Sequence, residues 1–104
     1  MKDFEISNAI EDIAKNYFIC KNHFRLQTFS SGKPDFRSPY YKYYRDVEMS
    51  INHLISEEQL IIRYGFFMPP RNTLWNLLYV DDEHFRELKS RAMKNFLRFF
   101  NENH

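Results

Sequence analysis

"VDDEHFRELKSRAMKNF", residues 80–96, is the stretch that decides the fold expected for this chain. Along it and its continuation, apolar residues recur at intervals of three and four, which is the spacing of one face of an α-helix. The pattern predicts a helix over about residues 82–101. Its apolar side consists of Phe85, Leu88, Ala92, Phe96 and Phe99. Three carboxylates stand at its start, and we expect Asp81 or Asp82 to cap it.

The residues before this helix have the spacing of a helix-turn-helix, a unit of about 20 residues in which two helices pack at a steep angle. Its five apolar places are filled by Leu74, Leu78, Val80, Phe85 and Leu88. Trp75 and Tyr79 stand where a small residue and a glycine are usual. Because many helical hairpins have this apolar spacing, the pattern fits DNA binding and plain core packing equally well.

Two helices are predicted in the N-terminal half. Apolar residues recur at helical spacing from Ile6 to Phe24 and predict an amphipathic helix over about residues 5–26. Residues 28–39, which gather Ser, Gly, Pro and Asp, are expected to form the main loop. Ser38 followed by Pro39 has the pattern of an N-cap and a first-turn proline, and it predicts a second helix over about residues 39–54.

A third helix is predicted to begin within "ISEEQL", residues 55–60. Ser56 and Gln59 have the spacing of a capping box, and Ile55 and Leu60 have that of a hydrophobic staple. A capped helix with an apolar contact across its first turn should therefore start here.

This third helix should carry Leu60, Ile61 and Tyr64 inward and end near Gly65, because "GFFMPP" cannot continue as regular helix. "NTLWNLLYV", residues 72–80, predicts a short helix after the prolines. No alternating apolar run is long enough to demand a strand. The sequence therefore predicts a small all-α domain with a C-terminal helix-turn-helix at residues 70–97.

Length and composition predict one folded domain. The chain has 104 residues, of which 43% are hydrophobic and 28% are charged. We expect residues 1–54 to support or dimerise the protein and residues 55–104 to form the helix-turn-helix part. Eleven Phe and seven Tyr residues supply more apolar area than one small core hides, which predicts a homodimer through the N-terminal helix or the Tyr40–Leu54 helix.

Several functional classes are unexpected for this sequence. The longest apolar runs are far shorter than the ~20 residues of a bilayer span, and the acidic N-terminus does not read as a signal peptide, so we expect a cytoplasmic protein without a membrane partner. The four His residues have no metal-ligand spacing, and the carboxylates form no isolated apolar pair. We therefore expect no catalytic residues, no metal, no cofactor and no enzymatic activity.

The C-terminal stretch resembles a known DNA-binding region. "VDDEHFRELKSRAMKNFLRF", residues 80–99, is similar to the end of region four of bacterial sigma factors, in which a valine turn is followed by Glu, Arg and an Arg-Ala-aliphatic step. The matching residues are Val80, Glu83, Phe85, Arg86, Leu88, Arg91, Ala92 and Met93, in register without a gap. "EEQLIIRYGF", residues 57–66, resembles the helix that precedes this motif. Residues 54–100 together look most like the ArpU-like family of small phage and prophage transcription regulators.

This resemblance implies a sequence-specific regulator that binds double-stranded DNA. Its recognition helix would place Glu83 and Arg86 against base edges, with His84 and Glu87 at neighbouring contact positions. Arg can bind guanine through two hydrogen bonds, and Glu can accept one from cytosine. The implied DNA-binding residues are Asp82, Glu83, His84, Arg86, Glu87, Ser90, Arg91 and Lys94. Asp82 departs from the related helices, which often have Arg or another polar residue there.

Two features leave a different reading open. The formal net charge of +1 is low for a DNA-binding domain, although a local basic stripe follows residue 85. Within that stripe, Glu87 and Arg91 have the i,i+4 spacing of a simple ion pair, and Arg98 fits an ordinary solvated face. The alternative is therefore a helical interaction module that binds RNA polymerase or another regulator without binding DNA.

Overall fold

The computed structural model describes residues 2–67 and 83–104 of the chain. These residues form helices and no strand, so the all-α prediction is confirmed for this part of the chain. The described elements are α1 (Asp3–Ser31), α2 (Pro39–Asn52), α3 (Ser56–Ile62), the π-helical turn η1 (Arg63–Phe67) and α5 (Glu83–Asn103). The predicted short helix at 72–80, and with it the first half of the expected helix-turn-helix, lies outside the described residues.

Helix α1 is longer than its apolar pattern predicts. The expectation of a loop from residue 28 is wrong, because the helix continues to Ser31. Within this last part of the helix, the hydroxyls of Thr28 and Ser31 donate to the carbonyls of Phe24 and Gln27 at 2.9 and 2.8 Å. The helix ends at Gly32, whose φ of 76° is left-handed and whose N–H donates to the Thr28 carbonyl.

The beginning of α2 is confirmed. The Ser38 hydroxyl accepts a hydrogen bond from the Tyr40 N–H at 3.2 Å, and Pro39 occupies the first helical position. The helix ends at Asn52, two residues before the predicted end. Val47 and Ile51 lie on its fully buried side.

The predicted start of α3 is correct in position and wrong in mechanism. Ile55 is the N-cap residue and no side chain caps the helix, so the capping box is absent. Gln59 instead donates its side-chain amide to the Leu54 carbonyl at 2.8 Å. The hydrophobic staple is also wrong, since Ile55 and Leu60 are 59% and 51% exposed, and Leu60 does not face the core.

Gly65 does not end the third helical segment. Its φ is not positive, and the chain passes through it as η1, a turn with i→i+5 hydrogen bonds, as far as Phe67. This extension buries Phe67, whose ring contacts Tyr17 and Phe96 at centroid distances of 5.2 and 5.7 Å. The π-helical turn therefore connects α1 with α5 through one aromatic side chain.

Helix α5 confirms the predicted C-terminal helix and shifts part of its buried face. Leu88, Ala92 and Phe96 are buried as expected, whereas Phe85 and Phe99 are only half-buried. Met93 and Phe100 are buried in addition. Phe100, not Phe99, is the core residue of the last turns, and the ring of the half-buried Phe99 lies 5.5 Å from that of His53.

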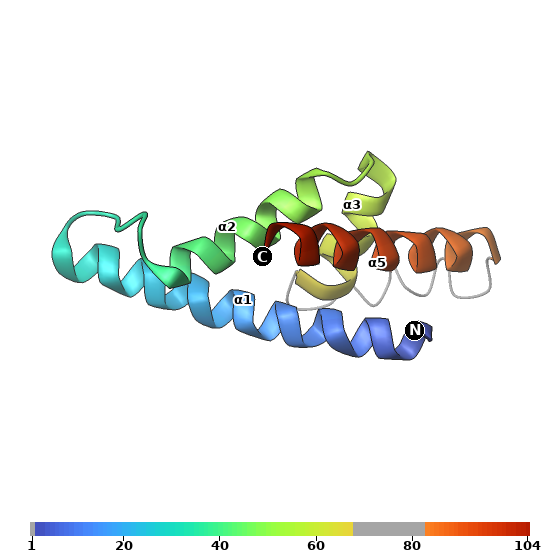
Figure 1. The fold of residues 1–104 in the computed structure, drawn as a ribbon, viewed down its shortest axis with the longest axis horizontal. Coiled ribbons are helices and arrows are strands. Elements are labelled where there is room, and N and C mark those ends of the chain that lie inside the picture. Colours follow the sequence, from blue (N-terminus) through green and yellow to red (C-terminus); the bar gives the residue numbers. More distant parts are fainter. Residues whose placement is uncertain (1, 68–82) are drawn as a thin grey trace.

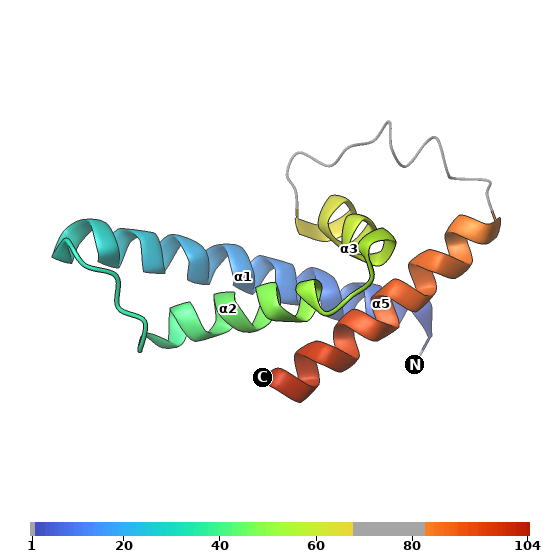
Figure 2. The same cartoon turned by 90° about the horizontal axis from the view of Figure 1, so that it is seen from above.

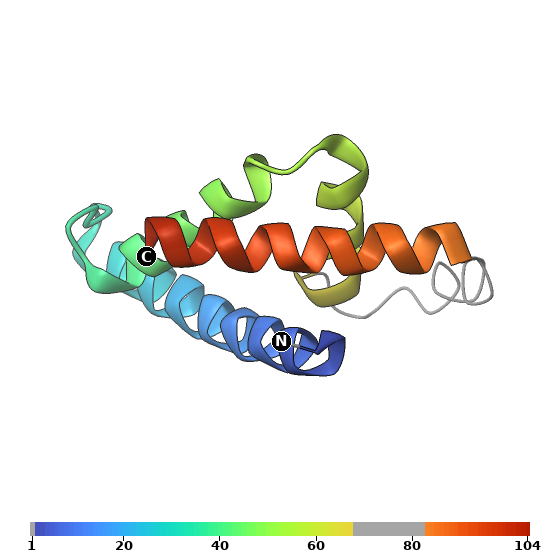
Figure 3. The same ribbon diagram turned by 45° about the vertical axis from the view of Figure 1, so that its right-hand side comes forward.

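Figures 1 and 2 show α1 and α2 as an antiparallel hairpin. Helix α5 crosses the part of this hairpin that contains the start of α1 and the end of α2. Figure 3 shows α3 and η1 on the same side of α1 as α5. The other end of the hairpin, where the chain turns between α1 and α2, projects beyond the remaining helices. The buried apolar side chains of α1, α2, α3, η1 and α5 form one continuous cluster, so the described residues share a single core.

Candidate nucleic-acid interface

The predicted contact residues lie mainly on the outer side of α5. Leu88, Ala92 and Phe96 follow one another at i,i+4 spacing and turn one side of the helix toward the core. The remaining positions therefore face outward. Of the predicted residues, the exposed ones are Glu83, His84, Arg86, Glu87, Arg91 and Lys94. Ser90 is half-buried, and Asp82 lies outside the described residues.

Five of the predicted residues line one open groove of about 590 Å³, which we call the α5 groove. They are Arg86, Glu87, Ser90, Arg91 and Lys94. Asp3 from α1 and Asn95 from α5 complete the lining. Glu83 and His84 are not part of it. The groove thus contains three basic and two acidic side chains, so its net charge is small.

Asp3 is a groove residue that helical periodicity did not predict. The Ser90 hydroxyl donates to the Asp3 carboxylate at 3.1 Å, which joins the first turn of α1 to the middle of α5. The two residues are 87 positions apart, and periodicity carries no information on contacts over such a separation. The bond places a carboxylate beside the side chains that were predicted to meet DNA.

Glu58 of α3 contacts two of the residues that line the groove, Asn95 and Arg91. Its side chain is only 4% exposed, and its carboxylate accepts a hydrogen bond from the Asn95 side-chain amide at 3.2 Å. The Arg91 guanidinium lies 3.7 Å from the same carboxylate. The i,i+4 spacing of Glu87 and Arg91 left an ion pair between them open, but Arg91 pairs with Glu58 of α3 instead. These contacts fix the orientation of α5 against α3.

Two basic residues in the second half of α5, Lys94 and Arg98, differ in their surroundings. Lys94 is exposed and lies at the groove. The Arg98 guanidinium lies 4.9 Å from the centre of the Phe99 ring, as in a cation–π contact. Lys94 is thus the better placed of the two to contact an anion in the groove.

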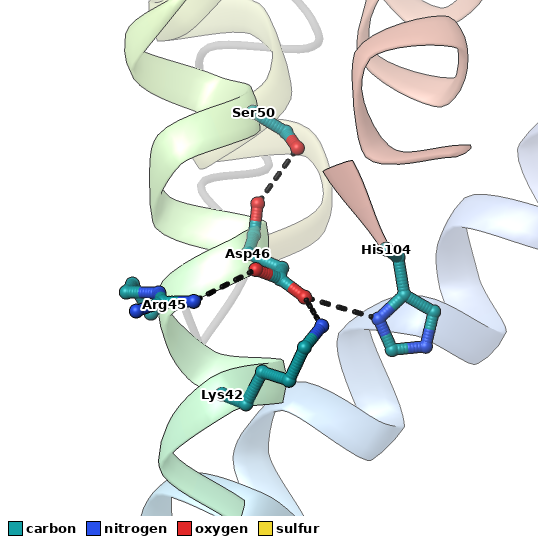
Figure 4. A network of polar contacts seen from close by, with 5 residues as sticks. All are labelled: Lys42, Arg45, Asp46, Ser50 and His104. Atoms are coloured by element: carbon teal, nitrogen blue, oxygen red, sulfur yellow. Dashed lines mark hydrogen bonds and ion pairs between the residues drawn. The ribbon is translucent and has the colours of Figure 1, made fainter. Parts of the chain in front are cut away.

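A second polar cluster surrounds Asp46, which is 2% exposed (Figure 4). Its carboxylate accepts from the Lys42 ammonium at 2.7 Å, lies 3.2 Å from Nδ1 of His104, and has the Arg45 guanidinium at 3.9 Å. The Ser50 hydroxyl donates to the Asp46 backbone carbonyl at 2.7 Å. Because the cluster joins α2 to the residue after α5, we assign it a structural role.

The pKa of Asp46 reflects this arrangement. Burial raises the pKa of the carboxyl group, but the hydrogen bonds from Lys42 and His104 and the neighbouring positive charges outweigh burial. The pKa of Asp46 therefore lies below its usual value, and the group is ionised at neutral pH.

Glu48 forms a third polar cluster between α1, α2 and η1. The Tyr17 hydroxyl donates to it at 2.6 Å, and the Arg63 guanidinium donates at 3.0 Å. Burial, and next the hydrogen bond to Glu48, raise the pKa of Tyr17. Since Tyr17 also packs against Tyr44 and Phe67, this cluster belongs to the core rather than to a site of chemistry.

Comparisons with protein-family models, curated proteins and solved structures found no match to this chain. Among the described residues, no helix has both the length and the apolar character required for a membrane span.

Proposed function

We propose that the protein is a sequence-specific transcription regulator of phage or prophage origin that binds double-stranded DNA through α5. The observation that carries this proposal is the α5 groove, because five residues implied by the sigma region-four resemblance line one open hollow. Arg86, Arg91 and Lys94 supply donors for bases or phosphates, and Ser90 supplies a hydroxyl. A homodimer, as expected from the aromatic content, would bring two such helices to a two-fold symmetric site.

The roles within the groove follow from side-chain chemistry. Arg86 is the proposed base-reading residue, since a guanidinium can donate two hydrogen bonds to guanine. Lys94 is the proposed phosphate contact, because an ammonium on a flexible stem recognises charge without reading sequence. Glu83, at the first turn, would accept from cytosine.

Binding selection from a pool of genomic fragments, followed by fluorescence anisotropy on a selected duplex, tests the proposal. Arg86→Ala should weaken binding roughly 5- to 150-fold, corresponding to about 1–3 kcal/mol, and relax the preference at one base pair. Lys94→Ala should weaken all sequences alike and reduce the salt slope by about 0.9. Arg98→Ala, a basic residue of the same helix that packs on Phe99, is the matched control and should change neither quantity.

A second candidate function is supported by the carboxylates around the groove. Asp3 and Glu87 line it, and Asp3 already binds Ser90, so phosphate groups would meet negative charge there. Such a surface suits a helical interaction module that binds RNA polymerase or another regulator. Co-purification of RNA polymerase without affinity for any selected duplex would favour this module. If Arg86→Ala leaves both the affinity and the sequence preference for a selected duplex unchanged, the interaction module should likewise replace the DNA-reading proposal.

A further inference from the structure

Positive charge is concentrated at the end of the molecule opposite the α5 groove. Residues 15–45, which we call the outer hairpin, contain seven Lys or Arg residues and one carboxylate, so their net charge is +6 although the whole chain has +1. The basic residues are Lys15, Lys21, Arg25, Lys33, Arg37, Lys42 and Arg45. Helix α1 has 29 residues, and at 1.5 Å each it places Ser31, at the tip of the outer hairpin, about 40 Å from Asp3. The two surfaces are therefore distinct.

Much of this charge is available to a partner. Lys42 and Arg45 are engaged with Asp46, but Arg25, Lys33 and Arg37 are exposed and lie beyond ion-pair distance of every carboxylate in the described residues. Asp35, the only acid of the outer hairpin, accepts the backbone N–H of Arg37 at 3.0 Å and so stabilises the turn. The outer hairpin thus presents uncompensated positive charge around its tip.

Aromatic rings lie among these charges. Phe29 is 88% exposed and Phe36 is 62% exposed. Phe36 is supported from behind, since the Tyr41 ring lies at 5.0 Å and the Phe24 ring at 6.2 Å. His23 and Tyr40 stack at 4.6 Å with nearly parallel rings. Exposed rings on a supported helical hairpin are surfaces on which flat ligands can stack.

We propose that the outer hairpin binds single-stranded nucleic acid, with Phe29 and Phe36 stacking on bases and Arg25, Lys33 and Arg37 contacting phosphates. Interleaved basic and aromatic side chains are the combination that single-strand binding uses, because every base has a π-face and every nucleotide a charge. A duplex keeps its bases stacked inside and offers no face to Phe29. The net charge of +6 disfavours the same end of a second copy as the partner.

The chemistry also distinguishes nucleic acid from a lipid surface. Anionic lipid would be attracted by the same charges, but a helix that lies on a membrane buries a continuous apolar face and keeps its basic residues on the opposite face. Here the exposed ring of Phe36 lies in the turn, directly before Arg37 and close to Lys33 in the chain, so apolar and basic side chains are interleaved. Nucleic acid is therefore the favoured anion.

Fluorescence anisotropy with a labelled 20-nucleotide oligo-dT, titrated with the full-length protein at 50 and 200 mM salt, tests this proposal. The wild-type protein should bind more tightly at the lower salt. Phe29→Ala and Phe36→Ala should each weaken binding roughly 5- to 100-fold. Arg25→Ala, Lys33→Ala and Arg37→Ala should each reduce the slope of log K against log salt by about 0.7. All five positions are exposed, so circular dichroism should show an unchanged fold.

Matched controls separate this surface from the rest of the molecule. Phe4→Ala alters a ring of similar exposure, 63%, at the other end of the same helix and should leave oligo-dT binding unchanged. Arg86→Ala should do the same, so that loss of duplex reading and loss of single-strand binding are observed independently. Absence of oligo-dT binding at 50 mM salt would overturn the proposal, as would binding that ignores Phe29 and Phe36. Binding to phosphatidylserine vesicles with the same residue dependence, and not to oligo-dT, would replace nucleic acid by a membrane surface.

Discussion

The surroundings of Asp46 predict how the stability of the fold depends on pH. A carboxylate that is 2% exposed is tolerated because Lys42 and His104 satisfy its oxygens. The lowered pKa of Asp46 means that the ionised carboxylate is more favourable in the folded protein than in the unfolded chain, so ionisation of Asp46 stabilises the fold. This stabilisation is present above the unfolded value of 3.8 and is lost as pH falls through the lower folded value.

Asp46→Asn should therefore destabilise the protein at neutral pH and much less in acid. At pH 7 we expect a loss of about 1–3 kcal/mol, since hydrogen bonds to a charged group are removed and the partners are half-exposed. Thermal unfolding followed by circular dichroism between pH 7 and pH 2 measures the difference. Asp12→Asn, an exposed carboxylate on α1, is the control and should stay within about 0.5 kcal/mol. A difference between wild type and Asp46→Asn that persists at pH 2 would contradict this account.

Two serines at the starts of neighbouring helices differ in function. Ser38 caps α2 through its hydroxyl, whereas Ser56 is the first residue of α3 and caps nothing. Ser38→Ala should cost about 1 kcal/mol, which lowers Tm by roughly 4–8 °C in a domain of this size. Ser56→Ala should leave Tm nearly unchanged. Equal effects in thermal denaturation would mean that the capping box of the third helix forms after all.

The two glycines provide a matched test of helix continuation. Gly32 has a φ of 76° with open space around its α-carbon, so Gly32→Ala meets backbone strain and no clash and should cost about 1–2 kcal/mol. Gly65 lies within η1 without a positive φ, also with open space. Gly65→Ala should be neutral or stabilising by up to about 1 kcal/mol. Urea unfolding of both variants measures the two changes, and destabilisation by Gly65→Ala would argue that this glycine ends a helix.

Periodicity predicted the helices because burial of one face repeats with the helix itself. Leu88, Ala92 and Phe96 could be predicted as core residues on that basis, and Ser38 could be predicted as a cap because the signal is local. Helix ends were harder to predict, as α1 shows, since Thr28 and Ser31, residues typical of loops, lie inside the helix and Gly32 ends it. The π-helical turn carries no sequence signal that distinguishes it from the ending expected at Gly65.

Contacts between distant elements mark the limit of what the sequence could predict. Five groove residues were predicted from a resemblance along one helix, but the partners Asp3 and Glu58 come from α1 and α3. Their positions depend on how the helices cross, which follows from packing of the whole core and not from any local pattern. The partnership of Asp46 with His104, 58 residues away, has the same origin.

The predicted homodimer belongs to the scale of the whole molecule. Three apolar side chains are exposed away from the basic tip. Met49 on α2 is 41% exposed, Ile55 in the turn after α2 is 59% exposed, and Leu60 on α3 is 51% exposed. Light scattering at high concentration should give twice the chain mass of 12.8 kDa. Met49→Glu, on the predicted contact helix α2, should reduce that mass to one chain, whereas Phe29→Ala should not. A wild-type protein that remains at one chain mass would refute the dimer.

The segregation of charge along α1 gives the protein a large electric dipole. The outer hairpin carries +6, whereas the described residues outside it, 2–14, 46–67 and 83–104, together carry −4, so positive and negative charge are separated within a nearly neutral chain. Retention on an ion-exchange resin depends on the face that a protein can turn toward the matrix, and not on net charge alone. This protein should therefore be retained at pH 7.9, its calculated isoelectric point, by cation-exchange and anion-exchange resins alike.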